Sequence, residues 1–181
     1  MLRVSSGSKR GFKLKVPLGG SVRPNTSKVR KMIFDILPPV TNLNVLDVFA
    51  GSGALGIEAL SMAAKYATFI DNNPSSIKCI KANLKKCEFE ARSTVIKKDS
   101  SIALREFAKQ NKKFDLILMD PPYSYFDEKT VNGIIRNALK LLVSDGIVVC
   151  EHPRKEKIKI DVKFCRVKEY KDKCITFCWS N

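Results

Sequence analysis

The chain has 181 residues, 44% of them hydrophobic, which suits one domain with a substantial core but not two ordinary domains. Its 33 basic and 18 acidic residues give a net charge of +15, and this excess makes a nucleic acid the leading kind of partner. No apolar run has the length of a transmembrane helix, and the N-terminus lacks the apolar stretch of a secretory signal. We therefore expect a cytoplasmic protein without a membrane partner.

The positive charge is concentrated at the two ends. Residues 1–31 contain nine basic and no acidic residues, and residues 152–181 contain nine basic and four acidic ones. Between them, residues 32–151 are almost neutral, with 15 basic and 14 acidic residues. This distribution predicts that the ends hold the acidic partner and that the central body carries out the chemistry.

The cysteines do not indicate a metal site. The six cysteines form no CxxC pair, and His152 is the single histidine of the chain. Four of the cysteines lie in segments that read as the interior of a helix or strand, where a free thiol behaves as a small buried apolar group. We expect no metal.

In chain order, the first elements are a glycine-rich basic arm over residues 1–26 and an amphipathic helix over 27–37, which Pro38 and Pro39 end. We divide the chain here into the arm, 1–26, and one catalytic domain, 27–181. Strand-like apolar runs then alternate with helical patterns. The strands are predicted at 44–50, 67–71, 94–99, 114–120 and 146–151, and a terminal hairpin is predicted from 162–170 and 174–179, with Lys171, Asp172 and Lys173 between its strands.

Four helices are predicted between these strands. The first covers 54–63, and the last covers 128–142 and ends before Asp145-Gly146. Ser75 or Ser76 is expected to cap the second, and Ser100 or Ser101 the third, with Ile102 and Phe107 facing inward. Strands that are apolar on both faces and alternate with helices predict an α/β protein, with a mostly parallel sheet, helices on both faces and an antiparallel hairpin at the C-terminal edge.

A glycine loop joins the first of these strands to the first helix. Gly51, Gly53 and Gly56 form a G-x-G-x-x-G pattern, and Asp71 ends the next strand twenty residues after Gly51. Glycines permit a tight turn close to a ligand, and a carboxylate at the second strand end suits the two hydroxyls of a ribose. The pattern therefore predicts a site for a cofactor that contains adenosine.

Two classes of cofactor fit this loop. A dinucleotide places a pyrophosphate at the helix N-terminus, whereas S-adenosylmethionine presents an amine and a carboxylate there. Asp47, on the strand before the loop, suits the amine, although a strand-end acid can also cap backbone amides. Asp99 is either a contact to the adenine amino group or the N-cap of the following helix.

The most specific motif is Asp120-Pro121-Pro122-Tyr123, which begins at the last residue of the strand predicted at 114–120 and follows its apolar run FDLILM. In an open α/β sheet, ligands bind beyond the carboxyl ends of the strands, so this motif and the glycine loop are expected to face one crevice. The Asp120 carboxylate and the Pro121 carbonyl can each accept an N–H from an exocyclic amino group, and Tyr123 can stack on its base. The motif thus predicts methylation of a base amino group; the simpler alternative is a Pro-Pro turn with an aromatic anchor.

On these residues the chain resembles the bacterial guanine-N2 methyltransferases that modify the RNA of the small ribosomal subunit. LDVFAGSGALGIEAL at 46–60 looks like the cofactor loop of that family, and MDPPY at 119–123 looks like its target-base motif. Arg23-Pro24, Thr26, Val29-Arg30 and Phe34 resemble its N-terminal motif, as do Gly7, Lys9, Gly11, Leu14 and Pro17 in the arm. The resemblance covers most of the chain.

The resemblance implies a Rossmann-like class I methyltransferase with a seven-stranded sheet, S-adenosylmethionine as the cofactor, and a guanine of 16S ribosomal RNA as the substrate. It implies cofactor-binding roles for Asp47, Gly51, Gly53, Asp71 and Asp99, with Phe49, Asn72 and Ser100 beside them in the same site. It carries the catalytic motif over to Asp120, Pro121, Pro122 and Tyr123. The expected partner is small-subunit ribosomal RNA, alone or in an assembled 30S particle, bound by a monomer.

From the charge of the N-terminal segment we predict that Arg10, Lys13, Arg23 and Arg30 contact RNA phosphates. Three alternatives to this function stay open. Asp-Pro-Pro-Tyr also occurs in DNA adenine-N6 methyltransferases, although this chain has little room for a DNA-recognition domain. The chain can also be a Rossmann-like RNA-binding module without catalysis, or, on the glycine loop alone, a nicotinamide oxidoreductase.

Overall fold

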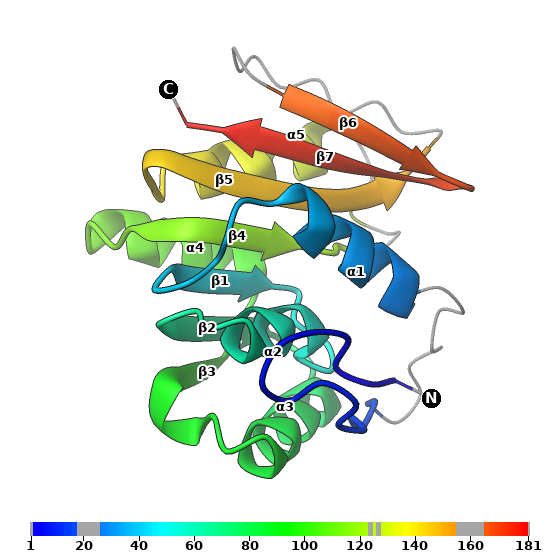
Figure 1. The fold of residues 1–181 in the computed structure, drawn as a ribbon. Helices are drawn as coiled ribbons and strands as arrows, with labels where there is room; N and C mark the ends of the chain where they lie inside the picture. The colour runs from blue at the N-terminus through cyan, green and yellow to red at the C-terminus, as the bar shows by residue number, and fades with distance from the viewer. Residues whose placement is uncertain (1, 18–25, 123–124, 126–127, 155–164, 181) are drawn as a thin grey trace.

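The computed structural model describes the chain except for residues 1, 18–25, 123–124, 126–127, 155–164 and 181; side chains at 26 and 128–131 are also left undescribed. Its sheet has seven strands in the order β3-β2-β1-β4-β5-β7-β6 (Figure 1). The strands are β1 (Asn44–Val48), β2 (Tyr66–Asp71), β3 (Ser93–Lys97), β4 (Phe114–Met119), β5 (Leu142–Pro153), β6 (Cys165–Tyr170) and β7 (Lys173–Trp179). Strands β1 to β5 pair in parallel, and β7 runs antiparallel between β5 and β6. The predicted fold class is confirmed.

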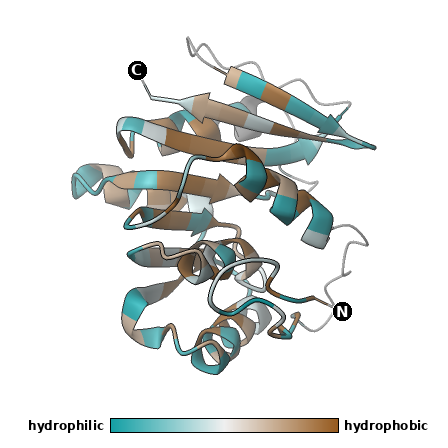
Figure 2. Cartoon of the chain, in the orientation of Figure 1, coloured by the Kyte–Doolittle hydropathy of each residue, from teal (hydrophilic) through white to brown (hydrophobic). Residues whose placement is uncertain are grey.

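Helices cover both faces of the sheet. Helices α1 (Thr26–Ile36), α2 (Ala54–Ser61) and α3 (Pro74–Lys86) lie on one face, and α4 (Ser100–Lys109) and α5 (Glu128–Leu139) lie on the other (Figure 1). A short 3₁₀ helix, η1 (Glu90–Arg92), precedes β3. Adjacent side chains of one strand enter opposite cores: Val45 packs in the core under α1–α3, and Leu46 in the core under α4 and α5. The central strands are accordingly apolar along both faces (Figure 2).

Asparagine and aspartate, not the predicted serines, cap α3 and α4; the alternative reading of Asp99 as an N-cap is confirmed. Asn73 caps α3, because its side chain accepts a 2.8 Å hydrogen bond from the Ser75 amide and Pro74 suits the first helical position. Asp99 caps α4 by accepting a 3.1 Å bond from the Ile102 amide. The predictions of serine caps are therefore wrong. Ile102, placed at the exposed start of the helix, is 46% exposed rather than buried.

The arm packs against α2 and α3 (Figure 1). Arg3 and Lys13 form an antiparallel bridge, and Leu2, Val4 and Leu14 are buried in the core under α1–α3. At the turn, Gly7 has φ +77°, and a Cβ there would lie 2.0 Å from the Ser61 carbonyl oxygen, so this close approach requires glycine. Residues 2–17 are therefore part of the packed structure, and the boundary at residue 26 stays a prediction.

Arg30 is buried in this packing. Its Nε donates a 2.8 Å hydrogen bond to Glu58 Oε2, and the two side chains are 2% and 1% exposed. The Ser5 amide donates to both oxygens of Glu58, and Arg30 also donates to the Arg3 carbonyl. The guanidinium of Arg30 thus neutralises a buried carboxylate that joins α1, α2 and the arm, a structural role that was not predicted. Its contact with RNA phosphate stays a prediction.

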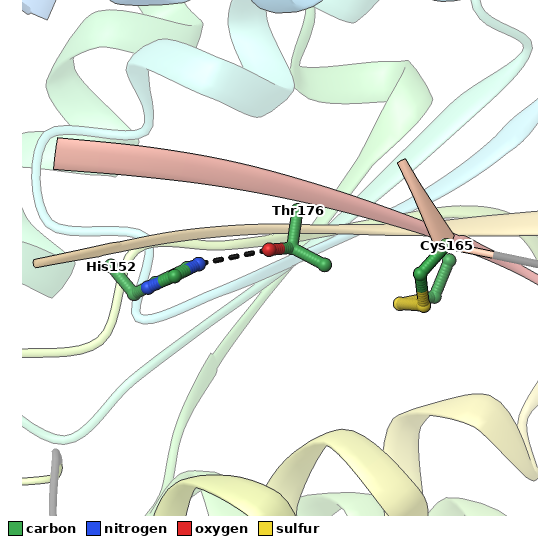
Figure 3. Close-up of a disulfide and its surroundings, with 4 residues drawn as sticks. His152, Cys165 and Thr176 are labelled. Carbon is green, nitrogen blue, oxygen red and sulfur yellow. Dashed lines mark hydrogen bonds between the residues drawn. A yellow bond between two sulfur atoms is a disulfide. The ribbon is translucent and has the colours of Figure 1, made fainter. Parts of the chain in front are cut away.

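The C-terminal hairpin contains a disulfide that was not predicted from the sequence. Cys165 of β6 lies directly opposite Cys178 of β7 and is bonded to it. Figure 3 shows Cys165 together with the neighbouring 2.8 Å hydrogen bond between His152 Nε2 and Thr176 Oγ1. The other four cysteines are free and buried, as expected for small apolar groups: Cys79, Cys87, Cys150 and Cys174.

Within the described part of the chain, none of the helices combines the length and apolar character that a bilayer crossing requires. The same residues contain no group of three or more His, Cys, Asp or Glu side chains arranged to hold a metal ion.

Candidate active site

The glycine loop forms a tight turn between β1 and α2. Gly51 and Gly53 have φ values of +55° and +77°, which glycine adopts at little cost, and the Gly53 amide donates to the Ala50 carbonyl. A Cβ on Gly56 would lie 2.4 Å from the Phe69 ring, so this glycine lets α2 pack closely on β2. The three glycines therefore shape the turn and hold the start of α2 at the edge of the sheet.

Asp47 lies on β1 beneath this turn and is almost fully buried. Its Oδ2 accepts a 2.9 Å hydrogen bond from the Gly56 amide. Burial raises the pKa of Asp47 to about 7; the Gly56 bond opposes this shift, whereas the charges of Asp120 and Asp71 add to it. An incoming ammonium group would stabilise the ionised form, so this carboxyl group is suited to bind a cationic ligand.

Asp71 is held at the end of β2 by the backbone on both sides. Its Oδ2 accepts from the Gly51 amide and its Oδ1 from the Asn73 amide, both at 2.8 Å. Each carboxylate oxygen retains a further acceptor site. The carboxylate of Asp71 is thus oriented at the cavity, with Asn72 beside it, and can accept hydrogen bonds from vicinal hydroxyls.

Tyr125 forms a further part of the cavity wall, and Asp99 holds its hydroxyl group. Asp99 caps α4 with Oδ1, and its Oδ2 accepts a 3.3 Å hydrogen bond from the Tyr125 hydroxyl. Burial and the neighbouring Asp99 charge raise the pKa of Tyr125, and its ring packs edge-on against Phe49, with 5.1 Å between ring centroids. The contact of Tyr125 with Asp99 was not predicted from the sequence. Phe49 and Tyr125 together provide an aromatic surface suited to a planar ring.

Asp120 directly follows β4, and the chain then turns through Pro121 and Pro122. The Pro122 carbonyl accepts a 2.9 Å bond from the Tyr125 amide, which closes this turn. Pro121 is buried and Pro122 is exposed. Tyr123, which the sequence predicts to stack on the target base, lies outside the described residues, and so does Arg23.

These residues meet at one cavity of about 490 Å³ at the carboxyl ends of the parallel strands. Eight of the predicted cofactor-binding and catalytic residues line it: Asp47, Phe49, Gly51, Asp71, Asn72, Ser100, Asp120 and Pro122. Arg30, predicted as an RNA contact, also lines it. Gly53, Asp99 and Pro121 are not among the residues that line it. The wall also contains residues to which the sequence analysis assigned no role in the site: Val16 and Pro17 of the arm, Ser76, Lys98 and Glu151. The predicted crevice is therefore one continuous site, and it extends to β5.

Arg10 and Lys13, the two remaining predicted RNA contacts, are exposed on the arm. The Lys13 backbone carbonyl accepts a 2.8 Å hydrogen bond from the Lys86 ammonium, which joins the arm to α3. Neither side chain lines the cavity, but Val16 and Pro17, a few residues further on, do.

The strand order, with β7 inserted antiparallel between β5 and β6, and the site at the carboxyl ends of β1, β2 and β4 define the fold of a class I methyltransferase. The yhhF protein of Escherichia coli has this fold, with a TM-score of 0.83 and 26% identity; the match covers 99% of this chain and 98% of yhhF.

The chain belongs to the family described as conserved hypothetical protein 95, whose model matches residues 2–179. It is 40% identical over 154 residues to YlbH of Bacillus subtilis, covering 84% of this chain and 83% of YlbH. It is 33% identical over 146 residues to the ribosomal RNA small subunit methyltransferase D of Escherichia coli, covering 80% of this chain and 68% of that enzyme. The resemblance predicted from the sequence is confirmed.

Proposed function

We propose that this protein transfers a methyl group from S-adenosylmethionine to the exocyclic N2 amino group of a guanine in 16S ribosomal RNA. The observation that carries the proposal is the single cavity that places Asp120 together with Asp47 and Asp71. Family membership with ribosomal RNA methyltransferases supports the same conclusion. We further propose that the protein acts as a monomer on the RNA of the small subunit, either free or in a 30S particle.

The residues of the cavity fit the proposed cofactor. Asp47 suits its amine, because the buried carboxyl group gains most from a cationic partner. Asp71 suits the ribose hydroxyls, and Phe49 with Tyr125 suits the face of the adenine ring. When bound, S-adenosylmethionine supplies a methyl group on a positively charged sulfur that leaves as a neutral thioether.

The residues after β4 orient the nucleophile. The lone pair of a guanine amino group is delocalised into the ring, so the group reacts only when it is held for in-line attack. We assign this task to the Asp120 carboxylate and the Pro121 carbonyl, each of which accepts one N–H. The methylated nitrogen is strongly acidic and loses its proton to solvent, so no strong general base is required.

The arm and α3 together supply a basic surface that reaches the cavity. We call it the arm–α3 face, and it consists of Arg10, Lys13, Lys78, Lys81, Lys85 and Lys86, all of them exposed. Helix α3 contains no acidic residue, and Glu88 just beyond it pairs with Lys9. Asn83 anchors the arm to α3 by accepting a 2.7 Å bond from the Lys15 amide. This surface supports RNA as the substrate, because a phosphate backbone lying on it would lead a base to the cavity.

The test is an assay with methyl-labelled S-adenosylmethionine and small-subunit particles from a strain that lacks the enzyme. Digestion of the RNA to nucleosides should place the label in N2-methylguanosine, at one position of 16S ribosomal RNA. Parallel reactions contain naked 16S RNA and double-stranded DNA. Label in DNA or in methyladenosine alone, or no transfer at all, would contradict the proposal.

A further inference from the structure

Glu151 is a buried acid in the cavity wall that neither the glycine loop nor the Asp-Pro-Pro-Tyr motif includes. Strands β4 and β5 are parallel, and Met119 is paired with Cys150. Asp120 directly follows Met119 and Glu151 follows Cys150, so continued register places their side chains on the same face of the sheet, with backbones about 5 Å apart. Both residues line the cavity, and Glu151 is only 6% exposed.

Lys173 holds Glu151 from the neighbouring strand. In the antiparallel β5–β7 pair, Glu151 lies opposite Ile175, and Lys173 is two residues away on the same face. The Lys173 ammonium donates a hydrogen bond to Glu151 Oε1, and the two side chains are 11% and 7% exposed. A carboxylate buried beside Asp120 is costly unless it is paired, and the Lys173 ammonium provides this pairing next to the site where the target base reacts.

Three adjacent groups on the Watson–Crick edge of guanine match this arrangement. The N2 amino group and the N1–H are donors, and O6 beside them is an acceptor. Asp120 and Glu151, which line the cavity, provide acceptors for N2–H and N1–H. Lys173 is not itself a lining residue, but its ammonium, held at Glu151, offers a donor for O6 on the strand beyond β5. A carboxylate accepts several hydrogen bonds and an ammonium donates three, so the Glu151–Lys173 pair can bind the base without separating.

We infer that Glu151 and Lys173 form the subsite that selects guanine, with Glu151 accepting N1–H and Lys173 donating to O6. The inference rests on the proposed function and specifies how its substrate is recognised. Adenine carries an unprotonated N1 in place of N1–H and lacks O6, so it would place a lone pair against the Glu151 carboxylate. The subsite therefore rejects adenine by charge repulsion and by loss of both bonds.

The decisive probe is 2-aminopurine, which retains the reactive amino group but lacks both N1–H and O6. The labelled position is first located in 16S RNA with the wild-type protein, and a synthetic RNA fragment is then made with guanine or 2-aminopurine there. For the wild type we expect kcat/KM on 2-aminopurine to be lower by about 100-fold, since removing each hydrogen bond to the base edge costs roughly tenfold or more. This comparison requires no variant.

The variant Glu151→Gln tests the residue itself. Lys173 attracts the amide oxygen of the glutamine, which turns the NH₂ group toward the base. That group repels N1–H of guanine and suits the unprotonated N1 of 2-aminopurine. The preference for guanine should therefore fall by at least about tenfold. The matched control is Glu169→Gln on β6, which removes an exposed ion pair with Arg154 and should leave the preference unchanged.

The outcomes separate this inference from the proposed function. Label in guanine N2 with equal use of 2-aminopurine would overturn the inference and leave the proposed function standing. Equal loss on both bases in Glu151→Gln, with unchanged melting temperature and cofactor affinity, would reduce Glu151 to a structural role and also overturn it. Label in adenine alone would overturn both.

Discussion

At the scale of single residues, the site depends on carboxyl groups whose environments differ. Asp71 accepts two backbone hydrogen bonds at the end of β2, whereas Asp47 is buried beneath the glycine turn with one. The glycine spacing and strand ends predict the position of both acids. Tyr125 and Glu151 could not be predicted in the same way, because their contacts to Asp99 and Lys173 depend on how distant segments pack.

The burial of Asp47 makes cofactor affinity depend on pH. Its pKa is raised from 3.8 to about 7, so the folded protein holds a proton that the unfolded chain has lost over this range. The stability that Asp47 contributes is complete below pH 3.8 and is lost as the pH rises through about 7. An amine bound at Asp47 favours the ionised form and expels this proton.

We therefore expect the affinity for S-adenosylhomocysteine, which retains the amine, to increase with pH by up to about tenfold per unit below the pKa and then level off. Isothermal titration calorimetry in buffers of different ionisation enthalpy measures both the affinity and the released proton. Asp47→Asn should bind more weakly, and its affinity should depend less on pH. An unchanged pH profile in that variant would show that the amine does not bind at Asp47.

At the scale of elements, the buried pair Arg30–Glu58 joins α1, α2 and the arm. Arg30→Ala leaves Glu58 buried without its partner, and we expect the free energy of unfolding to fall by about 3–5 kcal/mol. Lys31→Ala on the same helix removes an exposed pair with Asp35 and should change it by no more than about 0.5 kcal/mol. Urea unfolding measures both variants; equal effects would contradict the structural role of Arg30.

The arm–α3 face is the second feature at this scale. Because Leu2, Val4 and Leu14 are core residues, deleting the arm would disrupt the fold, and charge reversal is the sounder test. Lys13→Glu should weaken RNA binding and lower the slope of log affinity against log salt by about 1 or more, while cofactor affinity stays the same. Lys109→Glu at the end of α4, on the opposite face of the sheet, is the control. Identical losses in the two variants would mean that the binding surface is not this face.

At the scale of the whole molecule, alternating apolar runs and glycine punctuation predict the sheet, its helices and the shared crevice. The disulfide was missed because Lys173 was placed in the turn. The turn contains only Lys171 and Asp172, and the resulting register sets Cys165 opposite Cys178. The charge distribution read along the chain also misses part of the basic surface. In sequence, α3 belongs to the almost neutral centre, but in the structure its lysines extend the basic surface of the arm.

The central claim is that Asp120, in a cavity shared with the cofactor acids, orients a base for methyl transfer. The most direct measurement compares the wild type with Asp120→Ala for methyl transfer to small-subunit particles and, separately, for affinity toward 16S RNA and S-adenosylhomocysteine. We predict that turnover falls by about 100-fold or more while both affinities stay within about twofold. Unchanged turnover, or an RNA affinity that falls as far as the turnover does, would contradict this claim.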